Sequence, residues 1–326
     1  MDKLSQTDHR TGFWVLVAVL VIISVIAYNY AQNDISPSSA APIGPAVYLY
    51  VATDGDDATG DGSYANPFRT FREAVNHVDP AMINYLYPKG YLVLSDQEYQ
   101  SGSDGPIVIP EGSDVRVTKS LVGPMSVQPT RIMGRDTGIS NLIFEATNAS
   151  LRIFDLEWDS VYLDVRAGEN GSVAITSNLL FSTQAPGQTR LPGDLLVRTL
   201  AASADIRILG NTFRLADVAI SGSIRGLEIM HSPAGTVSVV KNKFYYPDID
   251  KRLSPDLDYE GIYLWRDLDY RGEGISILSN LFEHINTRVV QNEVIETDFG
   301  IILQGSDRAE LADNNFQRFF GTPIVK

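Results

Sequence analysis

The stretch Ile206-Arg207-Ile208-Leu209-Gly210-Asn211-Thr212-Phe213 decides the fold, because its pattern returns along the second half of the chain. In each copy, a few alternating β-branched residues lead into the phrase Asn-x-Phe. Clear copies carry Asn242 and Asn280, a weaker one carries Asn314, and a looser one with leucines carries Asn178. In chain order these five asparagines are 33, 31, 38 and 34 residues apart. A constant phrase at unequal intervals is typical of a solenoid whose loops differ in length.

A second phrase stands between the copies of the first and consists of a glycine followed by an apolar strand. Its clearest copies are Gly226-Leu227-Glu228-Ile229, Gly261-Ile262-Tyr263-Leu264 and Gly300-Ile301-Ile302-Leu303. Each repeat therefore contains a strand, an Asn turn, a Phe, a loop, a Gly and a second strand. We expect the asparagines to stack at one turn and to bond along the axis, while Phe and Ile fill the interior. The Asn and Phe residues are thus assigned to the scaffold and not to catalysis.

The composition describes a folded, acidic chain without cysteine. Of the 326 residues, 44% are hydrophobic and 20% are charged, which favours a packed core over disorder. The formal net charge of −14 argues against binding to nucleic acid or anionic lipid, because both require a basic face. Because cysteine is absent, disulfides and thiolate metal sites are excluded.

Residues 12–31 are predicted to form a transmembrane helix or signal anchor. Sixteen consecutive residues from Phe13 onward are uncharged, and a helix of about 20 residues spans the roughly 30 Å hydrocarbon core of a bilayer. Lys3 and Arg10 precede the segment, whereas the residues just after it include no lysine or arginine. The positive-inside rule places residues 1–11 in the cytoplasm and the rest of the chain outside, in the periplasm or at the cell surface.

Two alternatives remain for this segment. It is a cleaved signal peptide if a small-residue site such as Ser38-Ser39-Ala40 is used. It is a pilin-like leader if cleavage falls between Gly12 and Phe13. In each case residues 32–46, which are rich in proline, serine and alanine, are predicted to be a flexible linker before a folded domain of residues 47–326.

The start of this domain carries the most specific local signal. Tyr48 to Val51 predict a short strand, and a turn-rich loop of Asp and Gly residues follows it. Asn66 is predicted to cap a helix that begins at Pro67, because proline has no N–H to leave unpaired there. Apolar residues then recur at helical spacing on one face: Phe68, Phe71, Ala74, Val75 and Val78.

These features resemble the opening of right-handed parallel β-helix proteins of the pectate-lyase-like (pectin lyase fold) superfamily. The matching residues are Tyr50-Val51, Asp54-Gly55-Asp56-Asp57, Gly60, Pro67-Phe68, Thr70-Phe71 and Ala74. The resemblance implies an all-β, right-handed, single-stranded parallel β-helix with an N-terminal capping helix, here preceded by one transmembrane helix. The cap would cover apolar core and unpaired strand edges at the open end of the solenoid. The resemblance specifies the fold far more than the activity.

Asp54, Asp56 and Asp57 form an acidic loop that has two interpretations. Clustered carboxylates suit a hard cation such as Ca²⁺, whereas Asp and Gly also populate tight turns for backbone reasons. Because the spacing of an EF-hand loop is absent, we favour the turn and predict neither a metal nor another cofactor.

Function is expected in the unequal gaps between repeats, and the interval from Asn242 to Asn280 is the longest. In the superfamily that the chain resembles, ligands bind an outer sheet face walled by the longer turns. Aromatic rings beside carboxylates and guanidinium groups suit sugars, which need stacking and hydrogen bonding together. We therefore predict a ligand-binding face formed by Tyr245, Tyr246, Tyr259, Glu260, Tyr263 and Trp265.

Catalysis at the same face is the alternative. The nearest candidates for the cationic base of a lyase and for carboxylate acid/base work are Lys251, Arg252, Arg266, Asp267 and Asp269. The aspartate-rich and Gly-His-Gly signatures of polygalacturonases are absent, and so is a clear arginine-centred pectate-lyase signature. The sequence therefore favours a non-catalytic glycan-binding or envelope interaction module over a lyase, glycoside hydrolase or epimerase acting on an acidic polysaccharide.

The final residues, from Asn315 to Lys326, contain no amphipathic helix to close the solenoid. The last coil is expected to expose apolar surface and strand edges unless Phe319 to Pro323 fold over it. We therefore predict that this end contacts another protein or a second copy of the chain.

Overall fold

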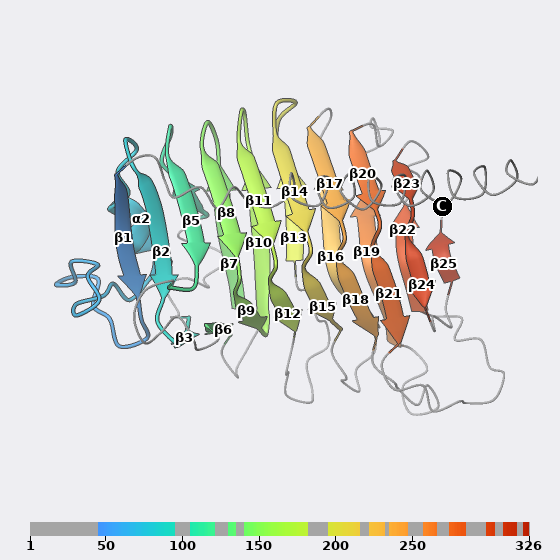
Figure 1. Cartoon of the computed structure of the whole chain (residues 1–326), viewed down its shortest axis with the longest axis horizontal. Coiled ribbons are helices and arrows are strands. Elements are labelled where there is room, and N and C mark those ends of the chain that lie inside the picture. Colours follow the sequence, from blue (N-terminus) through green and yellow to red (C-terminus); the bar gives the residue numbers. More distant parts are fainter. Residues whose placement is uncertain are drawn as a thin grey trace, which may run out of the picture. The chain divides into compact units, whose positions relative to one another are not determined.

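The computed structural model describes residues 45–94, 105–120, 130–134, 140–181, 195–215, 222–231, 235–246, 257–265, 274–284, 298–303, 309–317 and 322–325. They lie in one compact unit, Gly44–Lys326, and form three parallel sheets and one short helix (Figure 1). Within these ranges, no helix is long and apolar enough to cross a membrane. The predicted transmembrane segment 12–31 lies outside them.

In the described ranges, sheet A contains nine strands. Its strands, in spatial order, are β1 (Ala46–Val51), β2 (Ile83–Pro88), β5 (Asp114–Thr118), β8 (Ser150–Phe154), β11 (Ser172–Thr176), β14 (Asp205–Leu209), β17 (Thr236–Val240), β20 (Ile275–Leu278) and β23 (Glu310–Ala312).

Sheets B and C each hold eight described strands. Sheet B runs β3 (Tyr91–Val93), β6 (Arg131–Met133), β9 (Glu157–Asp159), β12 (Leu179–Phe181), β15 (Thr212–Arg214), β18 (Lys243–Tyr246), β21 (Leu281–His284) and β24 (Asn315–Gln317). Sheet C runs β4 (Ile107–Ile109), β7 (Ser140–Ala146), β10 (Val161–Ala167), β13 (Leu195–Thr199), β16 (Gly222–His231), β19 (Leu257–Trp265), β22 (Asp298–Leu303) and β25 (Thr322–Val325).

The order of the strands shows a parallel β-helix. Strands β5, β6 and β7 lie in sheets A, B and C, and β8 then returns to sheet A beside β5. The same three-strand step repeats to β25, so that in Figure 1 the strands of successive coils lie side by side from blue to red. Equivalent positions of each repeat are in register, as Val173, Ile206 and Val237 are in sheet A. The predicted all-β fold with parallel strands is confirmed.

Alternating side chains fill the interior of the coils. In β14, Ile206 and Ile208 are buried while Asp205 and Arg207 point outward, as period-two patterning requires. Each fully buried Ile or Leu contributes roughly 1.5–3 kcal/mol of transfer free energy. A single apolar core, with Phe71 at its capped end and Leu303 near its other end, therefore runs along the coils.

The asparagines of the repeated phrase form a ladder at the turn between sheets A and B. From Asn211 onward, each side-chain oxygen accepts hydrogen bonds of 2.9–3.1 Å from the main-chain N–H and the side-chain amide of the preceding asparagine. The ladder contains Asn178, Asn211, Asn242, Asn280 and Asn314, which confirms the predicted stacking. At its first rung, Asn178 accepts from the main-chain N–H of Leu156 and from the indole of Trp158. Trp158 is therefore a part of the ladder that the phrase did not indicate.

The phenylalanines of the phrase stack beside a row of glycines. Phe213, Phe244, Phe282 and Phe316 have ring centroids 4.7–4.9 Å apart and nearly parallel planes. A Cβ atom on Gly261 would lie 2.8 Å from the Phe282 ring. The glycine of the second phrase is therefore required because the phenylalanine of the first occupies the space of its side chain.

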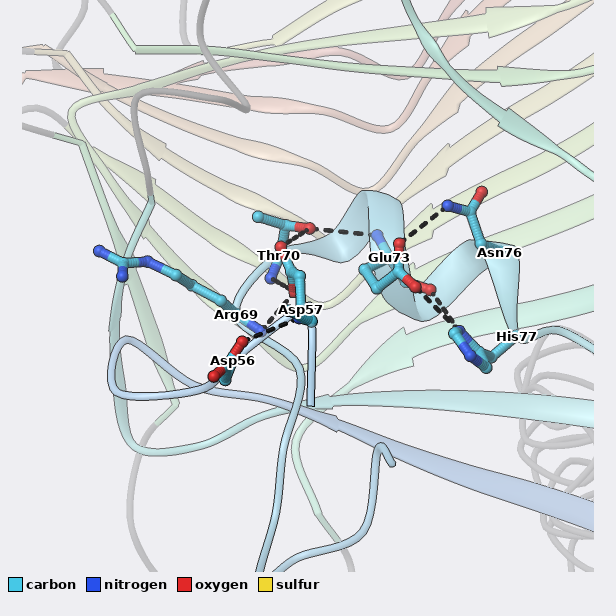
Figure 2. A network of polar contacts seen from close by, with 8 residues as sticks. Asp56, Asp57, Arg69, Thr70, Glu73, Asn76 and His77 are labelled. Carbon is cyan, nitrogen blue, oxygen red and sulfur yellow. Dashed lines mark hydrogen bonds and ion pairs between the residues drawn. The ribbon is translucent and has the colours of Figure 1, made fainter. Parts of the chain in front are cut away.

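The first coil is capped by helix α2 (Phe71–Asn76), which begins later than predicted. Asn66 does not cap it and Pro67 is not its first residue; Thr70 is the N-cap and accepts from Glu73 N–H at 3.1 Å (Figure 2). The reason is a tertiary contact, because Phe68 donates its N–H to the Tyr50 carbonyl and continues the edge of β1. The predicted capping helix itself is present and buries Phe71, Ala74 and Val75.

At the other end, β23, β24 and β25 are the last described strands of their sheets. Ile324 is 38% exposed there, and Phe316 is half-buried. Contact of this end with a partner stays a prediction.

Candidate functional site

Aromatic and charged groups are concentrated on the outer face of sheet C. Strands β10, β13, β16 and β19 are adjacent there. Register places Glu228 of β16 beside Tyr263 of β19, and Met230 beside Trp265. The outward residues of this sheet C face include the apolar Leu196 and Met230. Its aromatic and charged members are Tyr162, Asp164, Arg166, Arg198, Arg225, Glu228, Glu260, Tyr263 and Trp265.

A shift in side-chain alternation creates the centre of this face. Ile224 and Leu227 are both buried. In a regular strand, two residues at i and i+3 would point to opposite faces. The shift falls at Gly226, where a Cβ atom would lie 3.1 Å from the Phe244 ring. Because β19 shifts at its own glycine in the same way, Arg225 and Glu260 are paired in register and both carry their side chains outward.

Arg225 joins two carboxylates and two aromatic rings. Its Nε donates to Glu260 and its Nη1 lies 3.4 Å from Glu228 Oε2. Its guanidinium carbon lies 3.8 Å from the Tyr263 ring centroid and 5.2 Å from that of Trp265. The Trp265 indole N–H donates to Glu228 at 2.9 Å, and the two rings meet nearly edge-on at 5.1 Å. Contacts with Arg225 and Glu228 thus hold the orientation of the two rings.

Burial makes these ionic contacts strong. The side chains of Arg225, Glu228 and Glu260 are only 13%, 10% and 7% exposed. Burial alone lowers the pKa of Arg225, but the carboxylates of Glu260 and Glu228 outweigh it and raise that pKa overall. Burial also raises the pKa of Tyr263, which therefore stays a neutral phenol at physiological pH.

A second ionic cluster occupies the neighbouring strands. Asp164 of β10 accepts from Arg166 at 2.9 Å and from Arg198 of β13 at 3.1 Å. The two arginine side chains are 25% and 31% exposed, whereas Asp164 is 4% exposed. Burial, together with the negative charges of Glu228 and Asp164, raises the pKa of Tyr162. The two clusters are therefore electrostatically connected through Tyr162.

The arrangement offers recognition chemistry. The half-buried Trp265 ring and the partly exposed guanidinium groups of Arg166 and Arg198 provide stacking surface and hydrogen-bond donors on one face. Tyr263 is 9% exposed and supports Trp265 from below, because Arg225 packs over its ring. The carboxylates are already bound to arginine or indole groups. Among the described residues, no three His, Asp or Glu side chains gather in a way that would hold a metal ion.

The residues predicted to bind a ligand are divided by the structure among three places. Glu260, Tyr263 and Trp265 lie together on the sheet C face. Tyr245 points outward from sheet B, in register between Arg214 and Glu283. Tyr246 and Tyr259 are 0% and 1% exposed and belong to the core. The Tyr246 hydroxyl donates to the carbonyl of Phe299 at 2.8 Å.

Tyr259 is buried because of the shift at Gly261. Strict alternation back from Tyr263 would place Tyr259 outward and Glu260 inward. The irregularity reverses both, so that Glu260 reaches Arg225 and Tyr259 packs inside. The weaker catalytic candidates Lys251, Arg252, Arg266, Asp267 and Asp269 all lie outside the described residues.

Sequence reasoning did not find Arg225, Glu228 and Asp164. A signal for the first two was present, because aligning the glycines of the second phrase places Arg225 beside Glu260 and Glu228 beside Tyr263. Asp164 carried no comparable signal, since the residues at its paired positions are Ile143 and Leu196.

The acidic loop before the cap uses its carboxylates to hold its own backbone. Asp56 accepts from Ala58 N–H at 2.8 Å and from the Thr59 hydroxyl at 2.9 Å, and these bonds lower the pKa of Asp56. Asp57 accepts from Arg69 N–H at 2.7 Å and from Thr70, which ties the loop to the start of α2 (Figure 2). These contacts are those of the turn interpretation favoured over calcium.

No family model matches the chain, and no curated protein matches it by sequence. Among solved structures, a rhamnogalacturonan lyase aligns over 83% of this chain and 87% of its own, with 9% identity and a TM-score of 0.26. A polygalacturonase from Erwinia carotovora ssp. carotovora aligns over 89% of this chain and 100% of its own, with 11% identity and a TM-score of 0.29. Similarity at this level carries no argument about activity.

Proposed function

We propose that the chain is a membrane-tethered, extracytoplasmic, right-handed β-helix protein that binds a glycan on the sheet C face without catalysis. The observation that carries the proposal is the network of Trp265, Tyr263, Arg225 and Glu228. A sugar ring has an apolar face that stacks on aromatic side chains and hydroxyl groups that need fixed hydrogen-bond partners. This network supplies both within one surface.

The charge balance of this face favours a glycan with little charge. The guanidinium groups of Arg166, Arg198 and Arg225 are paired with the carboxylates of Asp164, Glu228 and Glu260. A ligand that carries a charge would have to compete with these internal pairs. A neutral ligand can hydrogen-bond to the outer edges of the same groups without breaking them.

The same pairing supports binding over catalysis. A general acid or base has to reach the reacting group with a proton or a lone pair available for transfer. On this face, Glu228 accepts from Arg225 and Trp265, and Asp164 accepts from two arginines. The carboxylates therefore act as supports for the arginine and aromatic side chains.

The tether rests on the sequence. The uncharged segment 12–31 and the Pro/Ser/Ala-rich linker 32–46 precede the domain. A linker of this composition allows the domain to reach a ligand near the membrane without a fixed orientation.

Calorimetric titration of the full chain with neutral and acidic oligosaccharides tests the proposal. We expect binding of a neutral oligosaccharide that W265A weakens at least about tenfold, a loss typical of a central aromatic contact. The matched control is Y91A, which removes another exposed ring (62%) on sheet B and should leave the affinity unchanged. Binding unaffected by W265A, or no binding by the wild type, would contradict the proposal.

Assays for unsaturated products and new reducing ends address the alternative. If the chain turned a polysaccharide over, the non-catalytic proposal would fail. Loss of that turnover in Asp267 or Arg266 variants would then establish a lyase, hydrolase or epimerase.

A further inference from the structure

A second row of residues crosses the outer face of sheet A, away from the sheet C face. Parallel register places Tyr48 of β1 beside Tyr85 of β2, Tyr85 beside Arg116 of β5, and Arg116 beside Arg152 of β8. Adjacent strands are about 4.8 Å apart, so these four side chains form a line along the axis of the coils. We name this line the Tyr–Arg row.

The aromatic half of the row is a stacked platform. Tyr48 and Tyr85 have ring centroids 5.4 Å apart with planes at 21°, and Tyr48 remains 48% exposed. Arg116 continues the stack, because its guanidinium carbon lies 5.4 Å from the Tyr85 centroid and its Nη1 donates to the Tyr85 hydroxyl at 3.0 Å. Tyr85 lies between them and is only 8% exposed, so the Tyr48 ring is the accessible aromatic surface of the row.

The cationic half of the row carries an excess positive charge. Arg116 is paired with Asp114 of its own strand at 2.9 Å. Arg152 is half-buried, and no carboxylate among the described residues pairs with it. Its neighbours across the two strand pairings are Arg116 and Ala174. Like charges directly opposite each other destabilise a sheet, and a bound anion between them would relieve that repulsion.

We infer that the Tyr–Arg row binds a linear acidic polysaccharide. An anionic group would lie at the Arg116–Arg152 step, and a sugar farther along the same polysaccharide would pack against the exposed Tyr48 ring. This ligand fits both halves of the row, whereas an anion without rings uses only the arginines. The site goes beyond the proposed function, because it lies on another sheet and selects a charged ligand.

Arg207 supplies a matched comparison on the same face. It lies in register one strand beyond Ala174 and is paired with Asp205 at 3.0 Å. Arg152 and Arg207 therefore both point outward from sheet A. They differ because a carboxylate pairs with Arg207 and none among the described residues pairs with Arg152.

The test is titration of the full chain with alginate, a linear polyuronate, alongside thermal unfolding with and without alginate. We expect R152A to weaken alginate binding about tenfold or more, as loss of a charge-assisted contact does. Its unfolding temperature without alginate should equal or exceed that of the wild type, because a like-charge pair is removed. R207A and W265A should bind alginate as the wild type does, and added salt should weaken binding.

Several results would overturn the inference. Wild-type affinity in R152A would overturn it, and so would a loss of affinity in R207A as large as the loss in R152A. Equal binding of neutral dextran or of poly-glutamate would contradict selection of an acidic sugar. Loss of alginate binding in W265A would move the site to sheet C, a result separate from failure of the neutral-glycan proposal.

Discussion

The side-chain oxygen of Asn211 accepts hydrogen bonds from both the main-chain N–H and the side-chain amide of Asn178, at 2.9 and 3.0 Å. Asn211 makes the same two bonds to Asn242 in the next coil. Both Asn211 and Asn242 are fully buried, so the polar atoms of one coil are satisfied only when the next coil is in place. The ladder thereby fixes the register on which both outer faces depend.

Removal of one interior rung should destabilise the protein strongly. N242A leaves the main-chain N–H and amide of Asn211 without their acceptor, and unsatisfied buried groups cost about 1–3 kcal/mol each. We expect a loss of about 3 kcal/mol in urea denaturation. N314A at the half-buried last rung should cost about 1 kcal/mol, because water can replace its contacts. Equal costs for the two variants would refute a cooperative ladder.

The glycine row should tolerate alanine to different degrees. A Cβ atom on Gly261 would lie 2.7 Å from the Gly300 carbonyl and also meet the Tyr246 hydroxyl, whereas one on Gly226 has its nearest neighbours at 3.1 Å. We expect G261A to cost about 1–3 kcal/mol, as overpacking does, and G226A to cost less. Denaturation curves for the two variants measure this, and the reverse order would contradict the packing of Phe against Gly.

Arg225 should stabilise the sheet C face mainly through its two glutamates. R225A leaves Glu228 and Glu260 buried without a counter-charge, a change that typically costs about 3–5 kcal/mol. The exposed R207A should cost less than about 1 kcal/mol. Urea denaturation of the two variants measures both costs. A cost of R225A no larger than that of R207A would contradict a stabilising role for the buried ion pairs.

Buried His231 should make stability fall in mild acid. Burial lowers its pKa from the ordinary 6.5, and its Nε2 lies 2.7 Å from the Gly235 carbonyl. The unfolded chain therefore binds a proton more readily than the folded one, so stability is lost as the pH falls below about 6.5. H231Q should lose less stability than the wild type between pH 7 and 5, measured by thermal unfolding. H77Q, at an exposed histidine, is the control, and parallel curves for H231Q and wild type would contradict the assignment.

The scaffold was readable from the sequence because it repeats identical residues. Asn211, Asn242 and Asn280 occupy equivalent positions, and each bonds to its copies in the neighbouring coils. The helix start was misplaced because Asn66 and Pro67 fit local capping rules, whereas the Phe68–Tyr50 contact is tertiary. The main-chain contact of Phe68 with β1 therefore outweighed the local capping preference of Asn66 and Pro67.

The candidate site was only partly readable because it depends on an irregularity. Alternation correctly placed Tyr263 and Trp265 outward, but the shift at Gly261 turned Tyr259 inward and Glu260 outward. The irregularity follows from the Phe stack beneath the glycines, which no single strand reveals. Arg225 enters the site from the preceding coil, and only the register between coils brings it to Glu260.

Hydrogen exchange of the full chain, with and without a saturating neutral oligosaccharide, tests the central claim most directly. We predict slower exchange in β16 and β19, which carry Arg225, Glu228, Tyr263 and Trp265, and unchanged exchange in β14 and β17 of sheet A. Protection confined to sheet A or sheet B, or an unchanged pattern under saturating ligand, would contradict a glycan site on the sheet C face.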